Sequence, residues 1–220
     1  MTNRNNSEDF SGMPATTQVG LHYYQEPIIN SVHHFYISGD IGPALHYIEM
    51  IHIIRSAAPT DVVHIHLNST GGQLDTGIQI INAMNESKAH IVCSIEAQAY
   101  SMASLIFLSA DSFIVHDNSI LMIHNFSSGI IGKGNEQRLR LNALTDLFEK
   151  FAKPIYLPFV SEEEFDGVID GKDIWFLTDE IKERLDRCVS TDNIINPEDH
   201  QITPDINLSS ESNQQTSDQE

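Results

Sequence analysis

The side chains best suited to chemistry lie in two short segments of the chain. Ser101 lies in a turn of small residues, between an apolar run that ends near Glu96 and a helical pattern. A serine on such a strand-to-helix turn can present its hydroxyl at the carboxyl edge of a sheet, where α/β folds hold their sites. His124 ends the apolar run 120–123, and a histidine can activate a serine by accepting its proton. Taken alone, Ser101 is better explained as a helix N-cap, and His124 as a structural or solvated residue at a strand end.

The segment Asn68–Ser69–Thr70–Gly71–Gly72 forms a second turn between a strand pattern and a helix pattern. Two consecutive glycines permit unusual backbone angles and leave amide N–H groups uncovered at a helix N-terminus. An ordinary βα turn would have the same residues. The segment is neither a Walker loop, since no Lys-Ser/Thr follows, nor a Gly-x-Gly-x-x-Gly dinucleotide loop.

The sequence gives little indication of a metal or a cofactor. His64 and His66 have an i, i+2 spacing, but no carboxylate or cysteine is close to them in sequence, so we interpret them as one face of a strand. Cys93 and Cys188 are too few for a disulfide scaffold or a cysteine-based zinc site. We therefore expect no cofactor and no metal site.

Composition excludes several classes of protein. The 220 residues carry 12 Lys and Arg against 31 Asp and Glu, a net charge of −19, which disfavours binding to nucleic acid or an anionic membrane. No apolar run approaches the roughly 20 residues of a membrane span, and the first residues lack the apolar region of a secretory signal. The sequence thus predicts an acidic cytoplasmic protein.

The apolar pattern predicts one α/β domain in which strands and helices alternate. Residues 1–19 and 191–220 are polar and lack periodicity, which predicts a flexible N-terminal segment and a disordered acidic tail around a folded domain at 20–190. Within the domain we expect strands at 33–38, 62–67, 90–96, 113–116 and 120–124, the last two joined by the turn 117–119. The expected helices are 44–57, one marked by residues 74–84, 101–109, 134–159 with interruptions at Pro154 and Pro158, and one from about Thr178.

Three of these segments, in this order, resemble the proteolytic subunit of the Clp proteases. The glycine turn 68–72 is similar to the family's Asn-Ser-Pro-Gly-Gly, with Thr70 in place of proline. The turn 100–103 is similar to its Ala-Ser-Met-Gly, with Ala103 in place of glycine, and residues 121–124 match its Met-Ile-His strand end. The resemblance covers about residues 33–186 and implies a spiral of repeated βαβ units, of the crotonase and Clp-protease type, with a long handle helix.

The resemblance also implies a serine endopeptidase mechanism. Ser101 would be the nucleophile and His124 its base, while the backbone N–H groups of Gly72 and Met102 would form the oxyanion hole. The third triad member would be Asp173, which precedes an aromatic-Leu-Thr sequence. Its spacing to Thr178 is one residue longer than usual in the family, so Asp170 remains the alternative.

For assembly, the resemblance implies heptameric rings, stacked as a tetradecamer through residues 134–159, that enclose the serines and admit peptides or unfolded proteins. The family's N-terminal segment is not recognisable at 20–30, so a hexameric ATPase unfoldase is only weakly implied as a partner. Two other functions remain open: a catalytically silent subunit or scaffold that pairs with an active homologue, and an acyl-coenzyme A enzyme of the crotonase type.

Overall fold

A computed structural model describes residues 31–192 of the chain, with side chains to Cys188. Its centre is a six-stranded sheet in the order β1-β2-β3-β5-β6, with β4 also paired to β3. All strands are parallel to their neighbours except β6, which is antiparallel to β5. The strands are β1 (Val32–Ser38), β2 (Val62–Ser69), β3 (His90–Tyr100), β4 (Ser112–Val115), β5 (Ile120–Ile123) and β6 (Ile174–Leu177).

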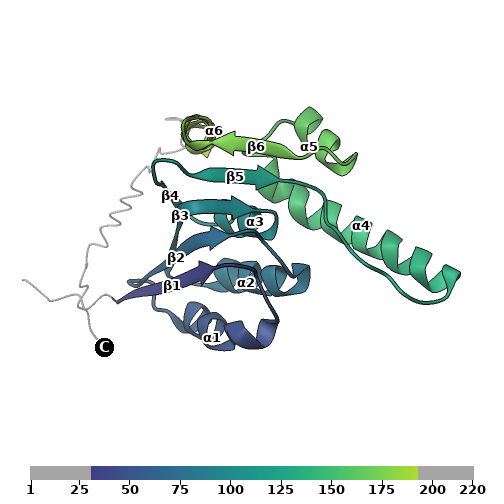
Figure 1. Cartoon of the computed structure of the whole chain (residues 1–220). Coiled ribbons are helices and arrows are strands. Elements are labelled where there is room, and N and C mark those ends of the chain that lie inside the picture. Colours follow the sequence, from purple (N-terminus) through teal and green to yellow (C-terminus); the bar gives the residue numbers. More distant parts are fainter. Residues whose placement is uncertain (1–30, 193–220) are drawn as a thin grey trace, which may run out of the picture.

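The helices between the strands make the crossovers that parallel pairing requires. Figure 1 shows α1, α2 and α3 together on one side of the sheet, while α4 extends away from it beyond β5. A 3₁₀ turn, η1 (Ala44–Tyr47), precedes the first helix. The helices are α1 (Ile48–Ser56), α2 (Leu74–Glu86), α3 (Met102–Leu108), α4 (Gly134–Tyr156), α5 (Glu162–Ile169) and α6 (Thr178–Asp192).

The two faces of the sheet differ in chemistry, as the residues of β2 illustrate. Val63, Ile65 and Leu67 are fully buried and belong to the hydrophobic core, whereas the alternate residues His64 and His66 are half-buried. Since successive side chains of a strand point to opposite faces, the helices cover an aliphatic face. The other face is polar along β2, and we call it the open face.

The expected α/β fold with a mostly parallel sheet is confirmed, but the strand β3 is longer than expected. Residues 112–115 and 120–123 form strands, yet they do not pair with each other. β4 pairs with residues 92–95 of β3, and β5 pairs with residues 98–100 of the same strand. This arrangement requires β3 to continue to Tyr100, four residues beyond the expected end.

The helix predicted at 134–159 differs from the observed α4 in two respects: Pro154 does not interrupt α4, and α4 ends three residues before the predicted end. α4 continues through Pro154 and ends at Tyr156. A proline removes one backbone hydrogen bond, and burial of Phe148, Ala152 and Tyr156 against the core favours continuation of the helix through it. Pro158 lies just beyond the C-cap residue Leu157.

The predicted terminal segments fall almost entirely outside the described residues. The segment 1–19 lies outside them, and so does the acidic tail from 193 onwards. The first two residues assigned to that tail, Thr191 and Asp192, belong to α6. Within residues 31–192, no helix is both long and apolar enough to span a membrane.

Candidate active site

Ser101 adopts a strained backbone conformation between β3 and α3. Its φ of 56° and ψ of −123° lie outside the regions that a residue with a Cβ readily adopts, at a cost of about 1–3 kcal/mol. Although Ser101 is at the N-cap position of α3, its side chain makes no capping hydrogen bond. The N-cap explanation therefore does not account for its hydroxyl, which a sharp turn holds at the end of a central strand.

Hydrogen bonds to β5 and α3 hold the Ser101 backbone in place, and α4 supports the second of these bonds. Its N–H donates to the carbonyl of Met122 in β5 over 2.9 Å. Its carbonyl accepts from Ser104 Oγ over 2.6 Å, and Ser104 Oγ lies 2.9 Å from the hydroxyl of Tyr156 in α4. Because Ser104 has a single hydroxyl proton and gives it to Ser101, the phenol of Tyr156 is the donor to Ser104. Tyr156 is fully buried, and this burial raises the pKa of its phenol.

The Gly71–Gly72 turn packs directly against the Ser101 turn. A Cβ on Gly71, whose φ is +91°, would lie 2.6 Å from the Tyr100 carbonyl oxygen and 2.7 Å from Ser101 Cβ. A Cβ on Gly72 would overlap the backbone of Ile41. Ile41 also fixes this turn, since its N–H donates to the Gly71 carbonyl over 2.7 Å. Glycine is required at both positions by close backbone approach.

Two backbone N–H groups at these turns lack hydrogen-bond partners. Among the described residues, neither the Gly72 amide nor the Met102 amide donates to any group. Met102 begins α3, so its N–H has no acceptor within the helix. Both residues line the same pocket. Uncommitted donors at adjacent turns are the arrangement expected of an oxyanion hole.

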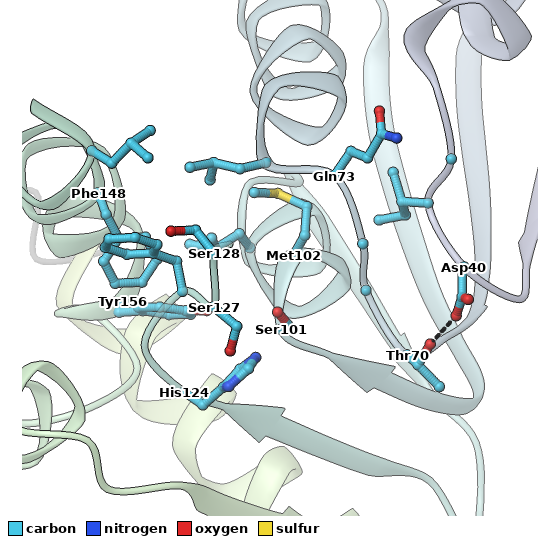
Figure 2. Close-up of a pocket in the computed structure, with 18 residues that line it drawn as sticks. Asp40, Thr70, Gln73, Ser101, Met102, His124, Ser127, Ser128, Phe148 and Tyr156 are labelled. Atoms are coloured by element: carbon cyan, nitrogen blue, oxygen red, sulfur yellow. Dashed lines mark hydrogen bonds between the residues drawn. The ribbon is translucent and has the colours of Figure 1, made fainter. Parts of the chain in front are cut away.

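The pocket that contains these amides has a volume of about 720 Å³ and also contains Ser101 and His124. In Figure 2 the ring of His124, at the end of β5, is turned towards Ser101 at the start of α3. His124 is half-buried. Within residues 31–192, no hydrogen bond joins Ser101 to His124. Such bonds are often long in unliganded enzymes and tighten when substrate binds.

Met102 and Ala103, which follow Ser101, contribute mainly to the core. The Met102 side chain packs against Gly77 of α2, where a Cβ would overlap it. Ala103 is fully buried and is not among the residues that line the pocket. The methyl group at the family's glycine position thus does not narrow the pocket.

Asp173 and Asp170 are both exposed, and neither lines the pocket. β5 and β6 pair in a register that ends with Ile123 opposite Ile174. Continued by one residue, this register sets Asp173 opposite His124, and directly opposite residues point to the same face. Asp170 is the C-cap of α5. Neither carboxylate is hydrogen-bonded to His124 among the described residues. The structure therefore brings four of the predicted site residues into one pocket, Ser101, His124, Gly72 and Met102, but neither candidate aspartate.

Several pocket residues were not singled out from the sequence. Thr70 donates a hydrogen bond to Asp40 at the edge of the pocket (Figure 2). A Thr in the glycine turn could have indicated such a bond, but Asp40 is 30 residues away and only the β1–β2 pairing brings it close. The wall opposite comes from the segment after β5 and from α4, and it includes Phe126, Ser127, Ser128, Leu144, Phe148 and Tyr156.

A comparison with known families agrees with this geometry. The sequence model of the family described as Clp protease matches residues 35–156, which is more than half of the chain. The matched region runs from β1 to the end of α4 and includes the glycine turn, Ser101 and His124, but not Asp173. The chain therefore belongs to the Clp protease family, whose members are serine peptidases.

Proposed function

We propose that this chain is a serine endopeptidase subunit in which Ser101 is the nucleophile and His124 is its general base. The observation that carries the proposal is the strained Ser101 turn, with a hydroxyl that caps no helix, in one pocket with a histidine and two unpartnered amides. A strained residue at a pocket is often held so for function.

The reaction would proceed in two halves. His124 takes the hydroxyl proton as Ser101 Oγ attacks the peptide carbonyl carbon, and then returns that proton to the leaving amine as the C–N bond breaks. Water, deprotonated by the same imidazole, then attacks the acyl-enzyme and releases the carboxylate product and Ser101. Negative charge on the carbonyl oxygen would be stabilised by the Gly72 and Met102 amides. Removal of one such donor typically reduces the rate about 10²–10³-fold.

Asp173 is proposed as the residue that orients His124 and stabilises its protonated form. Support comes from the β5–β6 register, which continues to the pair His124 and Asp173. Asp170, at the end of α5, has no such position on the ladder.

The subunit is proposed to act in an oligomer, as heptameric rings that stack into a barrel. The amino-terminal half of α4 supports this, because Leu139 and Leu141 are 68% and 47% exposed although apolar. Figure 1 shows this half extending away from the sheet. Enclosure would restrict substrates to short or unfolded peptides, and short peptides need no ATPase to unfold them.

The test is intact mass spectrometry after exposure to a fluorophosphonate, which reacts with activated serines. We expect one adduct per chain in the wild type and none in Ser101→Ala. Ser127→Ala, which removes the hydroxyl of another pocket serine, should retain the adduct. An adduct that persists in Ser101→Ala would overturn the assignment. No adduct on a folded, assembled wild type would instead favour the silent subunit or scaffold.

A further inference from the structure

Three histidines converge on the open face of the sheet, apart from the pocket. His34 of β1 pairs in register with His64 of β2, and His66 follows two residues later on the same face. Each offers a ring nitrogen, and these nitrogens all lie within 4.8 Å of one another. None of the three lines the pocket, so the cluster is independent of the proposed peptidase function.

Neighbouring side chains hold two of the three rings in orientation. His66 Nδ1 lies 2.7 Å from a carboxylate oxygen of Glu96 on β3, which leaves Nε2 directed to the cluster, 3.0 Å from His34 Nδ1. His64 Nε2 lies 3.1 Å from the hydroxyl of the buried Ser94. A histidine whose second nitrogen donates to a carboxylate is the usual form of a metal-ligating histidine.

The charge state of the cluster also suits a cation. The rings of His64 and His66 are stacked with centroids 3.8 Å apart. Burial and the neighbouring His66 and His34 lower the pKa of His64. The other groups that face the cluster are Glu96, His116, which lies 3.6 Å from Glu96, and Tyr36, which stacks on His66. The carboxylate of Glu96 thus supplies a negative charge beside the cluster.

We propose that His34, His64 and His66 bind one Zn²⁺ ion, with Glu96 orienting His66. In a tetrahedral site with Zn–N bonds of about 2.0–2.1 Å, two ligating nitrogens lie roughly 3.3 Å apart, close to the 3.0 Å between His34 Nδ1 and His66 Nε2. Three histidines leave the fourth position of the ion for water or another ligand. The ion would join β1, which lies at the edge of the sheet, to β2.

The test is Zn²⁺ titration of the full-length chain without an affinity tag, in competition with a chelating dye. We expect one ion per chain, with an affinity reduced about 10–100-fold in Glu96→Gln, as for other residues that hold a metal ligand. The affinity for Zn²⁺ should fall at least as much in His66→Gln, which lacks one of the proposed ligands. His52→Gln, which alters an exposed histidine of α1, should bind as the wild type does.

A second measurement distinguishes this cluster from the pocket histidine. Zn²⁺ should raise the melting temperature of the wild type and of His124→Gln, because binding to the folded state stabilises it. It should not do so in His66→Gln. Equal affinity in wild type, His66→Gln and Glu96→Gln would overturn the proposal, as would loss of binding in His124→Gln or His52→Gln.

Discussion

The strands β2 and β3 contribute to two regions built in different ways. At their carboxyl ends, the pocket depends on the backbone: a serine with positive φ, two glycines without room for a Cβ, and two amides that donate to no group in residues 31–192. On their open face, the histidine cluster depends on side chains from β1, β2 and β3 that only the strand register brings together.

The difference determines which substitutions each region tolerates. In the pocket, a change of side chain at Met102 leaves the Met102 amide in place. One methyl group added at Gly72 would instead displace the Gly72 amide. In the cluster, the backbone is ordinary extended strand, and the proposed metal binding depends on the imidazoles. The predictions below exploit this contrast.

The largest effect is expected at Asp173, the carboxylate that is proposed to orient His124 and does not itself line the pocket. Asp173→Asn should reduce hydrolysis of an unfolded, fluorescently labelled protein about 10⁴-fold, because an amide cannot stabilise the protonated histidine or fix its tautomer. Asp170→Asn should reduce the rate by no more than a few-fold. A larger loss of rate in Asp170→Asn than in Asp173→Asn would make Asp170 the third triad member.

A smaller loss is expected where the backbone supplies the chemistry. Gly72→Ala forces the turn away from Ile41 and should slow hydrolysis about 10²–10³-fold through the displaced amide. Thermal unfolding, measured in parallel, distinguishes a displaced amide from a loss of the fold as the cause of slower hydrolysis. Gly129→Ala, at a position with no atom near the added Cβ, serves as the control. Equal rates for Gly72→Ala and wild type would argue against the Gly72 amide as a donor.

The smallest effect is expected at Leu139 of α4, an exposed apolar side chain that belongs to neither region. Leu139→Lys should weaken self-association about tenfold or more by placing a charge in an apolar contact, and change the free energy of unfolding by roughly 0.5 kcal/mol or less. Sedimentation velocity measures the assembly. Asn142→Lys adds the same charge at a nearby exposed position, and an equal shift in both variants would show a general charge effect instead.

Sequence reasoning reached the pocket because its motifs are local. Ser101 and Gly71–Gly72 each lie in a strand-to-helix turn that short-range patterns reveal. The histidine cluster was missed because His34 is 30 residues from His64 and Glu96 is 30 residues from His66; no periodicity indicates that these strands are adjacent. The helix α5 and the strand β6 were also missed. All four residues of β6 are apolar although Trp175 and Leu177 are exposed, so no alternation of apolar and polar residues marks this strand.

The hydrogen-bond chain from Tyr156 through Ser104 to the Ser101 carbonyl bears on how acidity would affect this protein. Because burial raises the pKa of the phenol, Tyr156 remains a neutral donor across the range in which peptidases are normally assayed. Ser104 and a backbone carbonyl do not titrate there either. The support beneath the nucleophile is thus the same in mild acid and in mild base. A bell-shaped or sigmoidal activity curve would accordingly report ionisation of the reacting side chains themselves, free of any contribution from the scaffold that holds Ser101.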